Sequence, residues 1–144
     1  MKISDTINDF KAQGKTFYSF EFFPPKSDYA LDNLYCRIDR MASLQPAYID
    51  ITWGAGGSTA KRTLEMSKTI QKYFGLEVMM HLTCTNMPVS SINKVLIDAK
   101  ENGLSNILAL RGDPPDGAVE WKNNEKGFNY GIDLVRYIRK EFGD

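Results

Sequence analysis

The amino-acid sequence predicts an α/β fold built on a parallel sheet. Four apolar runs open near Phe17, Tyr48, Val78 and Asn106, at intervals of 31, 30 and 28 residues. This interval suits one strand followed by one covering helix. Between the runs, apolar residues recur every three or four positions, as on one face of a helix. Because strands that alternate with helices form parallel sheets with right-handed crossovers, we expect successive βα units.

The first element is a short helix that Ser4 or Asp5 can cap and that stops near Gly14. We expect it to act as a lid or as a plug at the bottom of the sheet. A strand rich in aromatic residues follows at 16–23, and the two prolines after it end the strand because they cannot donate to a ladder. The helix predicted at 29–43 should cover this strand.

The second unit consists of a strand at 47–52, a glycine-rich turn at 54–59 and a helix at 61–74. Gly75 follows the last apolar position of this helix, as is typical of a helix C-terminus. The third unit begins at once with a nearly continuous apolar strand at 76–83. Its apolar character indicates a strand that is buried on both faces.

The third unit continues with a break at 86–88 and a helix at 89–102. The fourth unit has a strand at 105–112, an irregular stretch at 114–127 and a helix at 130–142. The stretch at 114–127 is the longest irregular piece, and long loops on a rigid scaffold often carry function.

Two architectures fit this alternation, a doubly wound open sheet and a (β/α)8 barrel. A barrel takes roughly 250 residues and eight units, whereas this chain has 144 residues. It ends at 142–144, where a helix stops and a fifth strand would begin. If the barrel interpretation holds, we expect a truncated chain with two unpaired parallel edges.

The composition disfavours several classes of partner. Eighteen basic and eighteen acidic side chains leave no net charge, so neither nucleic acid nor an anionic membrane surface is an expected partner. The N-terminus lacks the long apolar segment of a secretory signal and carries acidic residues that transit peptides avoid. No apolar run reaches membrane-spanning length. The expected compartment is the cytoplasm.

Cysteine and histidine usage argues against a metal centre. Cys36 and Cys84 lie far apart in the sequence, which suits reduced thiols better than a disulfide framework or a zinc site. His81 is the only histidine, so a histidine-rich metal site is excluded. We therefore expect no metal.

Polar residues close the four strands and are the candidate site. Ligands bind at the carboxyl ends of parallel strands in both architectures, so Glu21, Thr52, His81 and Asp113 should converge around one cavity. If Glu21 faces that cavity between its phenylalanine neighbours, burial would favour its protonated form and suit it to act as a general acid. A solvated carboxylate, or one paired with Lys26, is the alternative.

The glycine-rich turn and the histidine each allow two interpretations. Exposed backbone N–H groups at 54–59 favour a phosphate, although the turn matches neither G-x-G-x-x-G nor the Walker A motif. The alternative is a tight turn in which Ser58 or Thr59 caps the next helix. His81 is either a buried, hydrogen-bonded imidazole or a donor to a cofactor.

The segment after the fourth strand is also open to two interpretations. Gly112 lets a ligand approach the backbone between Arg111 and Asp113, whereas the plainer alternative is an ion pair between these two side chains. Tyr130 and Gly131 at the start of the last helix could contact a planar ligand, or Tyr130 could pack into the core.

Five stretches, FEFFPPKS, DITWGAGGST, HLTC, NILALRGDPP and GFNYGIDLV, occur in this order and spacing. Together they closely resemble the methylenetetrahydrofolate reductase family, and its eukaryotic members in particular. The resemblance runs along essentially the whole chain. It implies a (β/α)8 TIM barrel, of which this chain supplies about the first four βα units. Residues 1–144 would then be the N-terminal part of a catalytic barrel.

The resemblance also implies an activity. NADPH or NADH would reduce a bound FAD, which would pass hydride to 5,10-methylenetetrahydrofolate and yield 5-methyltetrahydrofolate for one-carbon metabolism and methionine supply. Glu21 matches the general acid that opens the folate ring by protonation. Asp113 matches a carboxylate that lies by the flavin, contacts the folate and favours a cationic iminium. Both are therefore expected to be catalytic and to bind the substrate.

The remaining implied contacts fall into two groups. The positions expected to hold FAD are Thr52, Trp53, Ala55, His81, Arg111, Gly112, Asp113, Tyr130 and Gly131. The positions expected to line the nicotinamide side are Glu21, Phe22, Phe23, Pro24, Pro25, Lys26 and Thr52. The folate is the expected partner, and the full-length form is expected to be a homo-oligomer.

Two other hypotheses stay open at this point. The first is a catalytically incomplete half-barrel that persists as an assembly partner through its open edges. The second is a different phosphate-binding barrel enzyme that uses the glycine-rich turn.

Overall fold

The computed structural model describes residues 1–54, 59–114 and 127–143. A parallel sheet runs through the molecule in the order β1-β2-β3-β4. Every crossover therefore advances in the same direction, which for right-handed connections places the helices on one face. A doubly wound sheet reverses its order and carries helices on both faces. The strands are β1 (Ser19–Phe22), β2 (Tyr48–Ile51), β3 (Val78–Thr83) and β4 (Asn106–Leu110).

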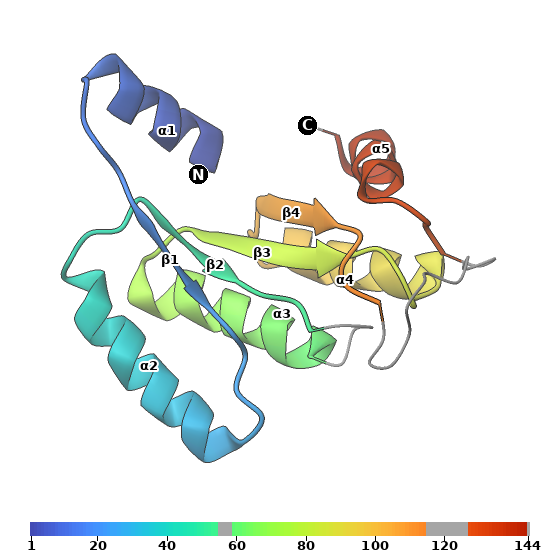
Figure 1. Ribbon diagram of the computed structural model, residues 1–144, viewed down its shortest axis with the longest axis horizontal. Helices are drawn as coiled ribbons and strands as arrows, with labels where there is room; N and C mark the ends of the chain where they lie inside the picture. The colour runs from blue at the N-terminus through green and yellow to red at the C-terminus, as the bar shows by residue number, and fades with distance from the viewer. Residues whose placement is uncertain (55–58, 115–126, 144) are drawn as a thin grey trace.

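The fold class is confirmed, because this sequential order is that of the first four units of a (β/α)8 barrel. Figure 1 shows the strands side by side, with the helices that connect them packed along the sheet. The helices are α1 (Ile3–Ala12), α2 (Asp28–Ala42), α3 (Ala60–Thr69), η2 (Ile70–Phe74), α4 (Val89–Glu101) and α5 (Gly131–Phe142).

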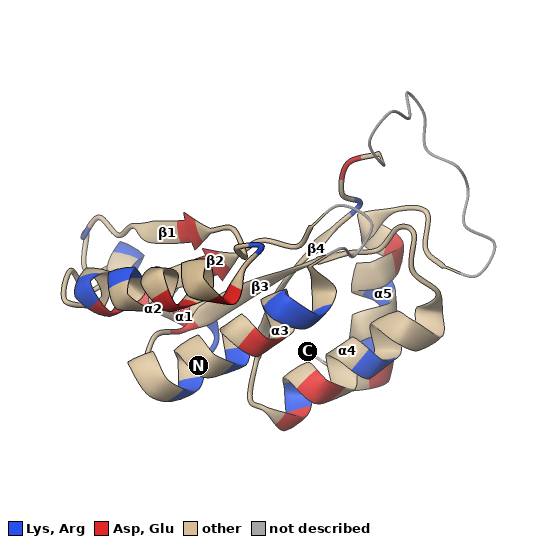
Figure 2. Cartoon of the chain, turned by 90° about the horizontal axis from the view of Figure 1, so that it is seen from below, with Lys and Arg blue, Asp and Glu red and all other residues tan. Residues whose placement is uncertain are grey.

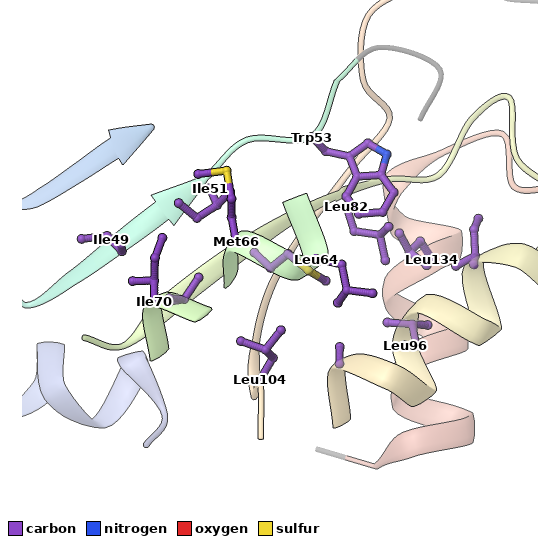
Figure 3. Close-up of a cluster of buried hydrophobic side chains, with 14 of the residues drawn as sticks. Ile49, Ile51, Trp53, Leu64, Met66, Ile70, Leu82, Leu96, Leu104 and Leu134 are labelled. Carbon is purple, nitrogen blue, oxygen red and sulfur yellow. The ribbon is translucent and has the colours of Figure 1, made fainter. Parts of the chain in front are cut away.

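The core lies between the sheet and the helices. Ile49 and Ile51 of β2 point toward the helices together with Met80 and Leu82 of β3, and each of them is at most 1% exposed. The helices contribute Leu64, Met66 and Ile70 from the middle of the chain and Leu96 and Leu134 from its later part (Figure 3). Since side chains alternate along a strand, the residues between these core positions face the opposite side of the sheet.

The first helix is a plug at the amino ends of the strands, as one of the two interpretations predicted. The backbone N–H of Ile3 donates to Oδ1 of Asn106 at 2.9 Å, and the amino terminus of Met1 pairs with Glu77 at 2.8 Å. The predicted cap is wrong, because Ser4 lies inside the helix and the N-cap position belongs to Lys2, which forms no side-chain capping bond. Packing against β4 sets the start of this helix.

The helix predicted at 61–74 is divided. Its last turn is a π-helix, η2, and Gly75 ends it with a φ of 66°. Ile70 is fully buried there, and the ring of Phe74 stacks on Tyr35 with 5.8 Å between centroids. A π turn adds one residue to a helix without interrupting its apolar face, so a pattern of threes and fours does not reveal it.

The surface of the helices carries mixed charge. Figure 2 shows basic and acidic residues interspersed along α3 and α4. Lys68 of α3, for example, contacts both Glu65 and Asp98, at 2.8 and 3.2 Å. None of the helices in the described ranges is long and apolar enough to cross a membrane.

Candidate functional site

Three ionisable side chains from adjacent strands form a row on the sheet face opposite the helices. Glu21 of β1 is in register with Asp50 of β2, and neighbouring parallel strands lie about 4.8 Å apart. Nε2 of His81, on β3, lies 3.4 Å from Oδ1 of Asp50. The stagger between β2 and β3 makes this contact diagonal, since Asp50 is in register with Met79. We call Glu21, Asp50 and His81 the interior row.

His81 is buried and hydrogen-bonded, as the plainer of its two interpretations stated. Its side chain is 10% exposed and that of Asp50 is 13% exposed. Sequence reasoning missed Asp50. The signal was present, however, because an aspartate between two isoleucines is the only charge in an otherwise apolar strand. A charge at such a position requires a partner when the strand is buried.

Glu21 is exposed in the described structure. The expectation that it would be enclosed is therefore not met here, because β1 is the edge strand of the sheet and only β2 flanks it. The structure records no ion pair between Glu21 and Lys26, both of which are described. Of the alternatives, the solvated carboxylate is the one that the structure shows.

The end of β2 is held by backbone and threonine contacts. The N–H of Thr52 donates to the carbonyl of Phe22 at 3.0 Å, and the Thr52 carbonyl accepts from the Thr63 hydroxyl at 2.9 Å. Trp53 is 7% exposed, and its Nε1 has no partner within the described ranges. The indole and Thr52 are thus fixed at the carboxyl edge of the sheet.

The predicted threonine cap is only half correct. Thr59 occupies the N-cap position of α3, yet its side chain makes no capping bond. Its hydroxyl instead accepts from the N–H of Gly54 at 2.7 Å and shares a 3.0 Å hydrogen bond with Thr63. The Thr59 hydroxyl therefore connects the two ends of the turn, which are Gly54 and Thr59 itself. Ala55 and Ser58, both named as candidates, lie outside the described residues.

The end of β4 is packed tightly against β3. Gly112 has a φ of 82°, and a Cβ on it would lie 2.8 Å from Cγ2 of Thr83. The hydroxyl of Thr85 donates to the carbonyl of Arg111 at 2.7 Å. Glycine is therefore required here by backbone conformation and by space. Close approach to Thr83 is a structural reason for Gly112 in addition to the expected ligand contact.

The structure shows a ring contact of Arg111, whereas the plainer alternative was an ion pair with Asp113. The Arg111 guanidinium lies over the Tyr130 ring, 4.9 Å from its centroid, and Asp113 is exposed. Tyr130 is 57% exposed, so packing into the core, the more conservative alternative, is wrong. A Cβ on Gly131 would lie 3.1 Å from the Ala109 carbonyl. The start of α5 is thus pressed against β4, which presents the tyrosine at the carboxyl edge.

The segment at 22–26, which is expected to face the nicotinamide, alternates between partly buried and exposed residues. Phe22 is partly buried against the core, whereas Phe23 is 75% exposed. Pro24 and Pro25 are partly buried, and Lys26 is exposed before α2 begins. Phe23 therefore gives this edge an exposed aromatic side chain next to β1.

The two cysteines are free thiols, as predicted. Cys36 is exposed, whereas Cys84 is buried directly after β3. Burial raises the pKa of the Cys84 thiol, and the charge of Asp133 adds to this effect. Within the described residues, no group of three or more histidine, cysteine, aspartate or glutamate side chains could hold a metal ion.

A cavity of about 930 Å³ lies at the amino ends of the strands, between α1, α4, α5 and the free edge of β4. Met79, Leu104 and Phe142 line it. The carboxyl-edge side chains described above lie on an open face. The structure brings His81 close to Asp50 and places Glu21 on the neighbouring strand. The convergence of Glu21, Thr52, His81 and Asp113 around one cavity stays a prediction.

The carboxyl edge offers several groups that can contact a flat, polar ligand. It offers the buried Trp53 indole N–H without a partner among the described residues, an exposed Tyr130 ring and the backbone at Gly112, where no side chain intervenes. His81 and Asp113 add hydrogen-bonding groups. A combination of aromatic and polar groups is typical of cofactor sites.

Comparison with known proteins places the chain in a family. A model of the methylenetetrahydrofolate reductase family matches residues 6–144. Methylenetetrahydrofolate reductase (NADH) 1 of Arabidopsis thaliana is 50% identical over 144 residues, which is 100% of this chain and 24% of the relative. The 5,10-methylenetetrahydrofolate reductase of Pectobacterium carotovorum is 38% identical over 132 residues, or 92% of this chain and 42% of the relative.

A solved structure from Aquifex aeolicus VF5 has the same fold, with a TM-score of 0.61 at 15% identity, and the match covers 98% of this chain and 57% of that one. The chain thus spans about a quarter of the length of the Arabidopsis thaliana relative. The family model and the identity along the full chain lead to one conclusion. The chain belongs to the methylenetetrahydrofolate reductase family.

Proposed function

We propose that residues 1–144 form the N-terminal part of a catalytic barrel that reduces 5,10-methylenetetrahydrofolate to 5-methyltetrahydrofolate. The observation that carries this proposal is the interior row, which includes Glu21 close to the carboxyl end of β1, in a chain of this family. Barrel enzymes bind their substrates at the carboxyl ends of the strands. The proposed setting is one-carbon metabolism and methionine supply in the cytoplasm, in a homo-oligomer.

The proposed role of Glu21 is to protonate a nitrogen of the folate's imidazolidine ring. Protonation opens the ring to an iminium whose carbon then accepts hydride. Glu21 is exposed on the open face and makes no ion pair within the described residues, so its carboxyl is accessible to a substrate. General acid catalysis of this kind contributes about 10²- to 10⁴-fold in rate.

The proposed FAD site extends along the carboxyl edge from β2 to α5. Thr52 and Trp53 would hold the cofactor from β2, and His81, Gly112 and Tyr130 from β3 and beyond. FAD, when bound there, would supply the hydride. Arg111, Gly131 and Ala55 complete the proposed set.

Asp113 is the proposed second catalytic carboxylate. It is exposed directly beyond Gly112, so its carboxylate is accessible to a bound ligand. A carboxylate beside the iminium stabilises the positive charge that develops there.

The reductant is proposed to be NADH. Three plant relatives, each about 50% identical to this chain, have NADH in their names. The segment from Phe22 to Lys26, beside Glu21, is the proposed nicotinamide contact.

A chimaera tests this proposal, with residues 1–144 replacing the matching segment of the Arabidopsis thaliana relative. The purified chimaera should show the visible absorbance of bound flavin and should form 5-methyltetrahydrofolate from 5,10-methylenetetrahydrofolate with NADH. Asp98→Asn, an exposed carboxylate on α4, is the matched control and should leave both unchanged. A folded chimaera without flavin or product would refute the proposal.

A second candidate function rests on the open edges of the sheet. β1 and β4 each lack a partner strand on one side within the described structure, and unpaired edges are templates for association. The 144-residue chain would then act as a flavin-free half-barrel that assembles through these edges. Sedimentation at several concentrations distinguishes the two, because a monomer that binds flavin excludes this candidate.

A further inference from the structure

The aspartate in the middle of the interior row has no role in the proposal above. Asp50 lies between Glu21 on one side and His81 on the other, and its side chain is 13% exposed. We propose that Asp50 is a positioning residue: it holds the proton of His81 on Nε2, so that Nδ1 faces the ligand as a hydrogen-bond acceptor. The identity of that ligand, FAD, rests on the proposed function.

The direction of the hydrogen bond follows from the two groups. An ionised carboxylate can only accept hydrogen bonds, and a neutral imidazole carries its proton on one nitrogen. Since Nε2 is the nitrogen that lies 3.4 Å from Oδ1 of Asp50, the proton must be on Nε2 for a bond to form. The opposite tautomer would place a lone pair against the carboxylate.

Asp50 has no other described group to compensate its charge. Its register neighbours are Glu21, which is acidic, and Met79, which is apolar. A largely buried carboxylate without a partner is costly. His81 is the single hydrogen-bond donor to Asp50 among the described residues. The hydrogen bond therefore compensates the buried charge of Asp50 and also fixes the orientation of the His81 ring.

The contact with Asp50 also determines the role of the second ring nitrogen of His81, Nδ1. Nδ1 makes no hydrogen bond within the described ranges. Nδ1 is not among the fully enclosed side-chain atoms that lack a partner in the described structure, so this nitrogen keeps some accessibility although His81 is largely buried. A neutral His81 with its proton on Nε2 presents Nδ1 as an acceptor. In this proposal Nδ1 accepts from an N–H or O–H of the ligand, which is opposite to the donor role in one of the two interpretations of the sequence.

Nuclear magnetic resonance of the 144-residue chain tests the tautomer, because the chain has one histidine and thus one imidazole. With ¹⁵N-labelled histidine, we expect a protected Nε2–H signal and an unprotonated Nδ1. Asp50→Ala should abolish the protected signal, whereas Asp50→Asn should retain it because an amide oxygen still accepts. Asp98→Asn is the control and should change nothing. A proton on Nδ1 in the unaltered chain would overturn the proposal without any substitution.

Flavin affinity of the chimaera tests the acceptor role. Loss of one positioned hydrogen bond should weaken FAD binding about 2- to 10-fold in Asp50→Ala, with a smaller loss in Asp50→Asn. Unchanged affinity in a folded Asp50→Ala chimaera would overturn the acceptor role. A chimaera that binds no FAD at all would instead refute the proposed function. The tautomer is measured in the 144-residue chain, so that test does not depend on FAD binding by the chimaera.

Discussion

Replacing Gly112 by alanine should destabilise the chain through two separable effects. The residue has a φ of 82°, and the left-handed region costs a side chain about 1–2 kcal/mol. The new Cβ would also lie 2.8 Å from Cγ2 and 3.1 Å from Cβ of Thr83. Rotation of the threonine side chain does not move its Cβ, so the backbone must shift, at about 1–3 kcal/mol. We expect a total loss of about 2–5 kcal/mol.

A matched glycine separates the two effects. Gly75 has a φ of 66°, and a Cβ added to it meets nothing within 4 Å. Gly75→Ala should therefore cost only the backbone part, about 1–2 kcal/mol. Urea denaturation followed by circular dichroism measures the free energy of unfolding of both variants. The difference between them reports the contact between β4 and β3.

A double-mutant cycle identifies the contacting atom. Thr83→Ser removes Cγ2 and should recover about 1 kcal/mol of the loss caused by Gly112→Ala, because the two positions are in contact. Equal costs for Gly112→Ala and Gly75→Ala, or no recovery in the double variant, would refute the packing that we describe at the end of β4.

Further predictions concern this edge of the sheet and the two cysteines. Thr83→Val should stabilise the chain by about 1 kcal/mol in urea denaturation, since the Thr83 hydroxyl is buried without a partner within the described ranges; a loss of stability would contradict this. Tyr130→Phe should keep the cation–π contact with Arg111, whereas Tyr130→Leu should lose about 0.5–1 kcal/mol in the same assay; equal stabilities would show that the contact contributes nothing. The pKa of Cys84 is raised from 9.0 by burial, so the folded state keeps a proton that the unfolded state loses, and stability should fall above pH 9.0 more steeply than in Cys84→Ala. Iodoacetamide should modify Cys36 before Cys84, and the reverse order would contradict the burial of Cys84.

The order of the elements could be predicted from the sequence because it depends on local patterns. Alternation of apolar strands with helices of period 3.6 is visible within windows of fifteen residues or so. The stop at Gly75 is confirmed by its positive φ of 66°. A left-handed backbone at the end of a helix is a requirement of a single residue, so the sequence reveals it directly.

The pairings within the site could not be predicted, because they depend on register and on packing. The contact of Asp50 with His81 needs the stagger between β2 and β3, which no local pattern records. The exposure of Tyr130 results from the close approach of Gly131 to β4. The hydroxyl of Thr59 had two possible N–H groups within reach, and only the folded turn selects Gly54. Nonlocal geometry therefore decides what each polar side chain binds.

The half-reactions of the chimaera with Glu21→Gln test the central claim most directly. Rapid mixing with NADH follows reduction of the flavin, and mixing of the reduced protein with 5,10-methylenetetrahydrofolate follows its reoxidation. If Glu21 protonates the folate, reduction by NADH should keep its rate, and reoxidation by the folate should slow by about 10²- to 10⁴-fold. Equal slowing of both half-reactions, or reoxidation at the unaltered rate, would contradict the account.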